Sequence, residues 1–159
     1  MPDEQVNNEA PILSLQKIYV RDISFENPNA PDIFVAEGLQ PNVEMNISVG
    51  SKLISDDHWE VSLKINAKMQ DKSSDKVLFE VEVEQSALFF IKNVPEDHIR
   101  PVLCIECPGI IFPFTRQLIS QLTLDGGFMP LLLEPVNFRV LYEANLQAES
   151  EQQENSRLQ

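Results

Sequence analysis

Three segments in the middle of the chain alternate between apolar and polar residues. They cover residues 43–49, 59–69 and 77–84. Successive side chains of a β-strand point to opposite sides, so alternation with a period of two residues predicts a strand with one apolar face in each segment. Short turn-like linkers separate them, which favours antiparallel pairing in chain order. The earlier segment 12–25 is β-branched and aromatic and predicts another strand.

The pattern changes further along, where apolar residues recur every three or four positions. This spacing predicts a helix over residues 95–124 with one apolar face and a glycine pair beyond its end. Pro108 and Pro113 lie inside the segment. Because proline lacks an N–H and clashes with the carbonyl four residues earlier, we expect a kink or break close to Pro108. A shorter helix is predicted within residues 136–148, with Asn137 as its N-cap.

These elements predict the fold class and the domain organisation. The expected fold is α+β, a four-stranded antiparallel sheet with a long kinked helix and a shorter C-terminal helix on one face. The single folded domain is expected over residues 12–148. Polar composition predicts a disordered acidic arm over residues 1–11 and a disordered acidic tail over residues 149–159.

Composition and charge narrow the classes of function. The chain has 159 residues, of which 43% are hydrophobic and 23% charged, as in a globular protein. Twelve basic and 25 acidic residues give a net charge of −13, which repels nucleic acid and anionic membranes. The N-terminal sequence has no secretory signal pattern, and no apolar run approaches the roughly 20 residues that span a bilayer. We therefore expect a cytoplasmic protein that neither binds nucleic acid nor inserts into a membrane.

A Cys-x-x-Cys pair, Cys104 and Cys107, raises the question of metal or redox chemistry. A zinc site needs four ligands, and neither His58 nor His98 lies at a familiar spacing from the pair. A redox pair places its first thiol at a helix N-terminus, whereas this pair lies inside the helical pattern with Cys107 on the apolar face. We interpret both residues as free, mostly buried thiols, and expect no metal and no cofactor.

Catalytic function is not indicated by the other side chains either. No Ser–His–Asp or Cys–His arrangement is evident. Carboxylates on an open sheet face stay solvated, so they do not acquire the separated pKa values that general acid–base catalysis requires. The expectation is that the protein is not an enzyme. A thiol–disulfide enzyme that uses the cysteine pair stays the alternative.

Carboxylates recur at alternate positions of two predicted strands. Glu80, Glu82 and Glu84 share one face of their strand, and Asp22 and Glu26 share a face of the first strand. Like charges side by side repel each other. The face is either a solvated surface that limits aggregation or a docking surface for a cationic partner, and both interpretations stay open.

Two irregular segments, 29–41 and 128–133, carry more large apolar residues than the sheet and helix need for a core. They indicate either ordinary core under long loops, a self-association interface, or a groove for apolar polypeptide segments. Each client Leu or Phe buried in such a groove would contribute on the order of 2 kcal/mol.

Longer blocks of the sequence resemble a known family. The blocks "KIYVRDISFENPNAP" (17–31), "CPGIIFPFTR" (107–116) and "GGFMPLLLEPVNF" (126–138), with the acidic tail, are similar to the protein-export chaperone family SecB. The resemblance covers about residues 13–148. It implies a cytosolic homotetramer, a dimer of dimers, that holds unfolded precursor proteins without ATP and passes them to the SecA translocation ATPase.

The resemblance also assigns site residues. The positions that match the family's client-peptide groove are Phe34, Leu39, Val43, Met45, Ile47, Phe128 and Leu133. The family's SecA contact is an acidic sheet face, matched here by Asp22, Glu26 and Glu82, and we add Glu80 and Glu84 because they share that face. The oligomer contacts of the family lie at strand edges that match Val81, Val83 and Gln85.

The chain departs from the family pattern at three places. Leu39 stands where a Trp is usual, Glu80 stands where an apolar residue is common, and "SAL" at 86–88 replaces a more Gly-rich stretch. These differences imply a weaker aromatic contact in the groove and a more negative acidic face. Two further functions remain open: a chaperone of the same fold devoted to a toxin–antitoxin pair, and an acidic oligomer with no client.

Overall fold

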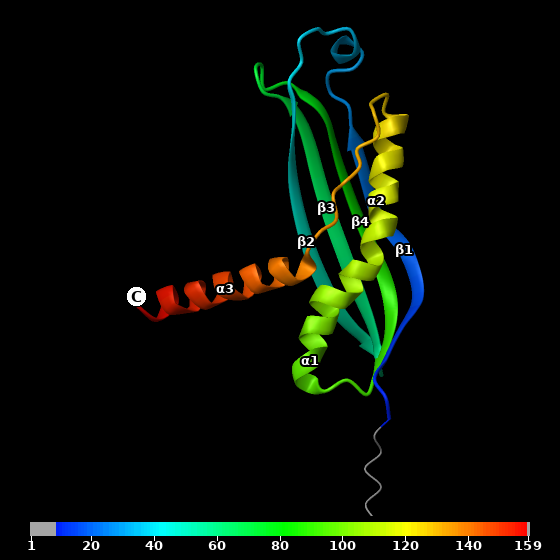
Figure 1. The fold of residues 1–159 in the computed structure, drawn as a ribbon, viewed down its shortest axis with the longest axis vertical. Coiled ribbons are helices and arrows are strands. Elements are labelled where there is room, and N and C mark those ends of the chain that lie inside the picture. The colour runs from blue at the N-terminus through cyan, green and yellow to red at the C-terminus, as the bar shows by residue number, and fades with distance from the viewer. Residues whose placement is uncertain (1–8, 159) are drawn as a thin grey trace, which may run out of the picture.

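The computed structural model describes residues 9–158, and within them the chain forms one sheet with helices on one side of it (Figure 1). The strands are β1 (Ile12–Glu26), β2 (Pro41–Ser55), β3 (His58–Asp71) and β4 (Val77–Lys92). The helices are α1 (Glu96–Pro101), α2 (Cys107–Asp125) and α3 (Phe138–Arg157). The predicted fold class, a four-stranded antiparallel sheet with a long helix and a C-terminal helix, is confirmed.

The order of strands in the sheet is β1-β4-β3-β2. Strands β2, β3 and β4 pair in chain order, as the alternation predicted. Strand β1 pairs with β4 instead, with Ile18 opposite Ala87 and Phe25 opposite Val81. The segment 27–40, here called the crossover, carries the chain from β1 to the far edge of the sheet. Strands β1 and β2 are therefore the two edges.

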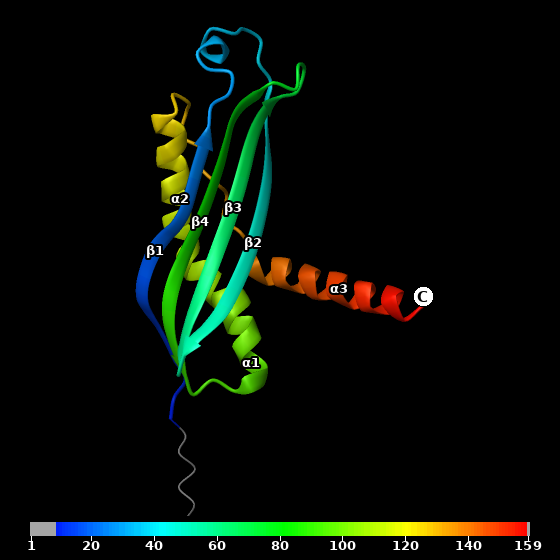
Figure 2. The ribbon, with the colours of Figure 1, turned by 180° about the vertical axis from the view of Figure 1, so that it is seen from behind.

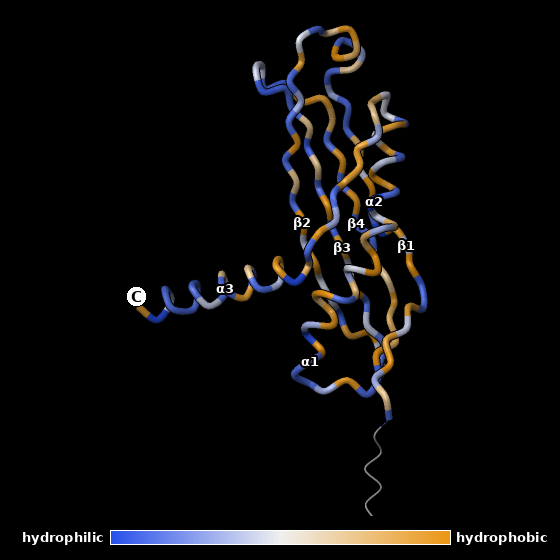
Figure 3. Tube along the Cα trace, viewed as in Figure 1, coloured by the Kyte–Doolittle hydropathy of each residue, from blue (hydrophilic) through white to orange (hydrophobic). Residues whose placement is uncertain are grey.

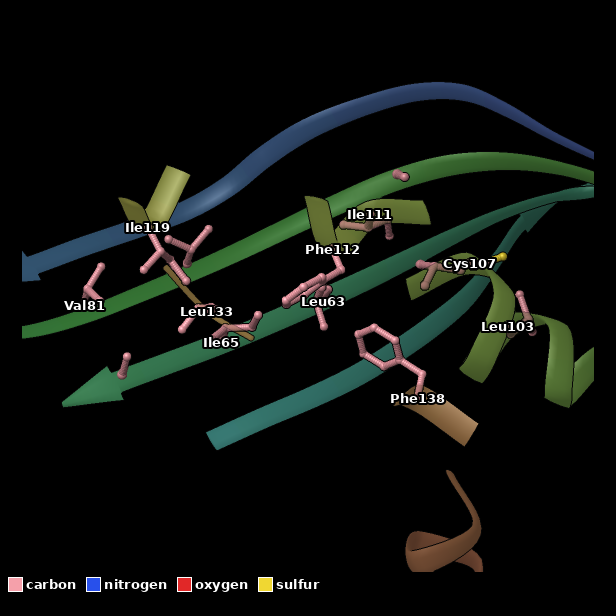
Figure 4. Packing of buried hydrophobic residues seen from close by; sticks show 14 of the residues in the cluster. Leu63, Ile65, Val81, Leu103, Cys107, Ile111, Phe112, Ile119, Leu133 and Phe138 are labelled. Atoms are coloured by element: carbon pink, nitrogen blue, oxygen red, sulfur yellow. The ribbon is translucent and has the colours of Figure 1, made fainter. Parts of the chain in front are cut away.

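The core lies between the inner face of the sheet and helix α2, which packs across β4 and β3 (Figure 4). Alternate residues of the two central strands are almost fully buried there: Val61, Leu63, Ile65 and Ala67 from β3, and Val81, Val83, Ala87 and Phe89 from β4. Helix α2 contributes Cys107, Ile111 and Ile119 from its buried side. Because each buried aliphatic or aromatic side chain contributes about 1.5–3 kcal/mol, this layer supplies most of the folding energy.

The predicted kink in the long helix is present. Helices α1 and α2 belong to one helical segment, Glu96–Asp125, with a π-helical turn at Val102–Glu106 between them. There the Cys107 N–H bonds to the Val102 carbonyl, five residues back. Pro108 follows directly. Its nitrogen has no hydrogen to donate to the carbonyl four residues earlier, and its ring would clash with that carbonyl in a regular α-helix. The wider π-helical turn relieves the clash, and such turns are a usual cause of helix kinks.

By length and composition alone, the helical segment Glu96–Asp125 could cross a membrane. Its apolar side, however, is the side that packs on the sheet, where Ile111, Phe112 and Ile119 are buried. Core helices of water-soluble domains satisfy the same length and composition test.

Helix α3 touches the rest of the protein through its first turns and then projects away from it (Figures 1 and 2). Its N-cap is Asn137, whose side chain accepts a hydrogen bond from the Val140 N–H, as predicted. Phe138 is buried and meets Phe112 edge to face, with ring centroids 6.0 Å apart. Further along, Arg100 forms an ion pair with Glu149 at 3.0 Å.

The C-terminal boundary differs from the expectation. The tail at 149–159 was expected to be disordered, whereas α3 continues as a helix to Arg157. Its last turns are polar and exposed (Figure 3). Glutamate and glutamine are good helix formers, and no glycine or proline interrupts them. The helix therefore continues beyond the residues that pack against the rest of the protein. Residues 1–8 of the predicted acidic arm lie outside the described residues.

Candidate functional site: an apolar stripe and an acidic face

An exposed apolar stripe runs from the crossover onto strand β2. Helix α2 packs on the two central strands and mainly the π-helical turn reaches β2, so part of the inner side of β2 stays exposed. Val43 and Met45 are 42% and 41% exposed, and Phe34 on the crossover is 48% exposed. We define the apolar stripe as Phe34, Leu39, Val43, Met45, Ile47 and Phe128, of which Leu39, Ile47 and Phe128 are half-buried. Of these residues, Leu39, Val43, Met45 and Ile47 lie on β2 or just before it, whereas Phe34 and Phe128 contact each other beside Phe79 of β4.

Aromatic contacts hold the crossover end of the stripe. The Phe34 and Phe128 rings lie 5.2 Å apart, and Phe128 in turn lies 4.9 Å from the buried Phe79. Gly127 has a φ of +93°, and a Cβ there would be 2.9 Å from the Phe34 ring. Glycine at this position therefore serves two needs, the left-handed end of helix α2 and the close approach of the Phe34 ring. Phe79 also stacks on Phe25 of β1, with ring centroids 5.8 Å apart.

The seventh predicted residue, Leu133, has a different place. It is only 4% exposed and lies in the core beside Ile65 (Figure 4). It therefore anchors the connector between α2 and α3 and presents no surface. Its neighbours Met129 and Leu132 are 89% and 64% exposed. Sequence reasoning did not assign these two to the site, because an irregular segment has no period that separates exposed leucines from buried ones.

The outer face of the sheet, on the side away from α2, has no helix packed on it (Figure 2). Pairing of β1 with β4 sets Asp22 opposite Glu84 and Glu26 opposite Glu80, with Ser24 opposite Glu82. All five predicted acidic residues therefore meet on one surface, here called the acidic face. Directly opposed like charges destabilise a sheet by a few tenths of a kcal/mol or more per pair, so this arrangement has a cost in stability.

Strand β3 supplies the basic border of the acidic face. Lys64 Nζ lies 3.0 Å from Glu82 Oε1, and the Asn66 amide donates to Glu80 and Glu82 at 3.2 and 3.3 Å. The Lys64 hydrogen bond, and then that from Asn66, lowers the pKa of the Glu82 carboxyl. Within residues 9–158, the ion pairs of this face involve Glu82 and leave Asp22, Glu26, Glu80 and Glu84 outside a salt bridge.

The prediction that Val81, Val83 and Gln85 lie at a strand edge is wrong. They belong to β4, which lies between β1 and β3. Val81 and Val83 are fully buried and Gln85 is 5% exposed beneath helix α2, where Thr115 donates a 2.7 Å hydrogen bond to the Gln85 side chain. Their own protomer already covers them, so they offer no surface to a second copy.

The free apolar edge is instead that of β1, which sequence reasoning missed. Ile18 and Phe25 of this strand pack against the core, but four other inward side chains are more than a third exposed: Leu13, Leu15, Val20 and Ile23. Helix α2 adds the exposed Ile110 and Phe114 on its outer side. These six residues are here called the β1 stripe. The irregular pattern of the segment gave no sign of which of its residues would be left uncovered.

The cysteine pair has the environment of buried apolar thiols. Cys107 is fully buried against the sheet, as predicted, and Cys104 is half-buried. Burial raises the pKa of the Cys107 thiol to about 12 and also raises the pKa of the Cys104 thiol. A reactive or metal-binding cysteine needs the opposite shift, toward the thiolate. Among the described residues, no three His, Cys, Asp or Glu side chains gather in a way that could hold a metal ion.

Comparison with known proteins gives the class to which this fold and these surfaces belong. The family model described as preprotein translocase subunit SecB matches residues 6–149. The protein-export protein SecB of Desulfotalea psychrophila is 48% identical over 145 residues, covering 91% of this chain and 93% of the relative. That of Magnetococcus marinus is 43% identical over 151 residues, covering 95% of each. The chain therefore belongs to the SecB family.

A solved structure shows the same fold. It is the SecB-like chaperone of Mycobacterium tuberculosis in complex with a ChAD peptide from an antitoxin. The TM-score is 0.64 at 14% identity, over 78% of this chain and 90% of the other.

Loss of the Lys64 side chain should strengthen binding of a basic peptide to the acidic face. Lys64 neutralises Glu82 in the free protein, so a cationic ligand must compete with it. Because exposed ion pairs are weak, we expect Lys64→Ala to tighten binding only about 1.5- to fivefold in low salt, measured by fluorescence anisotropy. The matched control is Lys68→Ala, because Lys68 borders the same face opposite Glu80 and forms no salt bridge within residues 9–158. Equal gains in both variants would contradict a specific role for Lys64.

Proposed function

We propose that this protein holds unfolded precursor polypeptides on its apolar stripe, without ATP, and delivers them to the SecA translocation ATPase through its acidic face. The observation that supports the proposal is the separation of the two surfaces. The apolar stripe lies on the inner side of the sheet edge, and the acidic face lies on the outer side. One sheet can therefore hold a client and a docking partner at the same time.

Holding a client requires accessible apolar surface that tolerates different sequences. The apolar stripe offers partly exposed aromatic and aliphatic side chains, and the exposed Met129 and Leu132 of the connector lie beyond Phe128. Each client side chain buried there contributes about 2 kcal/mol, so stable binding needs several of them, because the cost of association must be offset as well. Methionines such as Met45 adapt their shape to different partners. Burial of apolar client surface is favourable by itself, so this holding step requires no ATP.

Delivery requires a contact that forms and breaks readily. Asp22, Glu26, Glu80 and Glu84 are carboxylates without a salt bridge among the described residues, and the chain as a whole has a net charge of −13. Such a surface attracts a basic, zinc-bearing segment of the ATPase at long range. The attraction weakens with salt, because the Debye length falls from about 8 Å at 0.15 M to about 3 Å at 1 M.

Assembly into a cytosolic homotetramer, a dimer of dimers, would cover the β1 stripe. Strand β1 has an unpaired backbone edge, and such edges are a liability unless they are covered. Two copies related by a twofold axis can pair these edges, since an isologous contact uses the same surface twice. The outer side of α2, with Ile110 and Phe114, then joins one dimer to the next. The apolar stripe at the opposite edge stays available for clients.

Export is favoured over service to a toxin–antitoxin pair. The antitoxin peptide belongs to a structural neighbour with only 14% identity, whereas relatives at 48% and 43% identity are named as protein-export proteins. The complete acidic face supports the same choice, because a dedicated antitoxin chaperone has no need of a docking surface for the translocation motor.

Holding activity should depend on the apolar stripe. We expect the protein to suppress aggregation of a slowly folding precursor in the absence of nucleotide, measured by light scattering. The double variant Phe34→Ala/Met45→Ala should weaken client binding about tenfold, because it removes two partly exposed contacts. The control is Val35→Ala, which alters an equally apolar, 81% exposed residue of the crossover outside the stripe. Unchanged aggregation in the presence of wild-type protein would disprove the holding function.

Docking should depend on the sign of the acidic face. The triple variant Asp22→Lys, Glu26→Lys and Glu82→Lys should lose measurable SecA binding in low salt, because three negative charges on one surface become positive.

The matched control for this experiment carries the same change of charge elsewhere. Asp32→Lys, Asp56→Lys and Asp125→Lys alter three exposed carboxylates outside the sheet face. Surface plasmon resonance of both variants separates a local contact from an effect of net charge. Full SecA binding by the first variant, or equal loss in both, would overturn the docking assignment.

A further inference from the structure

A buried carboxylate ends the apolar inner row of strand β3. Along this strand Val61, Leu63, Ile65 and Ala67 are fully buried, and the inward position at the end of the row is occupied by Asp71, which is 3% exposed. A buried charge is costly unless it is well hydrogen-bonded. Its presence at this position therefore calls for a structural role that an apolar residue could not fill.

Asp71 accepts hydrogen bonds from two separate segments. The hydroxyls of Ser73 and Ser74, in the turn between β3 and β4, donate to Oδ2 at 2.8 and 2.6 Å. The backbone N–H of Gln40, the last residue of the crossover, donates to Oδ1 at 2.8 Å. The Gln40 carbonyl in turn accepts from the Lys72 N–H at 3.0 Å. Both the N–H and the carbonyl of Gln40 are therefore hydrogen-bonded to residues at the end of β3 and the start of the turn that follows it.

The crossover needs such an attachment at this end. Its beginning is tied by side-chain amides, with Asn27 donating to the Gly126 carbonyl at 2.9 Å and Asn29 to the Val77 carbonyl at 2.8 Å. Between the crossover and the β3–β4 turn lies a cavity of about 310 Å³, so close packing does not fix the segment there. Its end is held through Gln40, directly beside Leu39 of the apolar stripe.

We propose that Asp71 is a positioning residue for client binding: it clamps the end of the crossover and so holds Leu39 and Phe34 in place on the apolar stripe. The proposal rests on the proposed holding function. The clamp reduces the conformational entropy that client binding would otherwise have to remove, which is the usual benefit of a pre-organised surface. The Ser74 hydroxyl, the Gln40 N–H and the Ser73 hydroxyl together hold the pKa of Asp71 well below its usual range, so the clamp is ionised at neutral pH.

The test compares Asp71→Ala with Asp71→Asn by hydrogen–deuterium exchange and client binding. Alanine removes every acceptor, so exchange in residues 33–40 should rise, and client binding should weaken, by about tenfold each. Asparagine keeps an oxygen for the Gln40 N–H and should retain most of both properties. Asp75→Asn, at an exposed position of the same turn, is the control. If the alanine variant does not fold, Ser73→Ala/Ser74→Ala replaces it, with a smaller rise expected at the same residues.

The outcomes separate this proposal from the holding function. The clamp is refuted if Asp71→Ala changes neither exchange in residues 33–40 nor client affinity, or if exchange rises throughout the sheet, which would show a general loss of stability. It is also refuted if the asparagine variant is impaired as much as the alanine variant. If wild-type protein binds no client, the holding function fails, and exchange in residues 33–40 still decides whether the clamp exists.

Discussion

The pairing of β1 with β4 is the constraint on which both surfaces depend. Because the crossover carries the chain past the two central strands, the carboxylates of β1 lie beside those of β4, and neither set alone would make an acidic face. The same path leaves β2 as the other edge of the sheet and places Phe34 against Phe128, beyond the end of α2. A simple meander in chain order would have put β1 beside β2 and separated the carboxylates.

The width of the sheet, compared with that of the helix, explains the exposed apolar surface. Helix α2 covers the two central strands, where the inward residues are buried, and leaves both edges uncovered. One edge carries the apolar stripe and the other carries the β1 stripe. A core therefore forms in the centre, and the excess apolar area at the two edges stays exposed, as it does at the binding surfaces of other proteins.

The sequence predicted the local features of the fold well and its non-local features poorly. Alternation gave the three strands from β2 to β4, and Pro108 and Asn137 gave the kink and the start of α3, because each signal lies within a few residues. The neighbour of β1 depends on pairs such as Ile18 with Ala87, which are 69 residues apart, and no local pattern encodes them. The resemblance assigned Val81, Val83 and Gln85 to a strand edge, and no local signal showed that β4 is a central strand. Leu133, the length of α3 and the Asp71 clamp likewise depend on tertiary contacts.

The central claim is that client holding and motor docking use opposite sides of one sheet and are physically separate. The most direct measurement is the affinity of an unfolded, uncharged client peptide for the variant Asp22→Lys/Glu26→Lys/Glu82→Lys. The salt concentration is about 0.15 M, because electrostatic interactions are then screened beyond about 8 Å. The account predicts the same dissociation constant as for the unmodified protein, within twofold. A loss of client affinity that parallels the loss of SecA binding would contradict it.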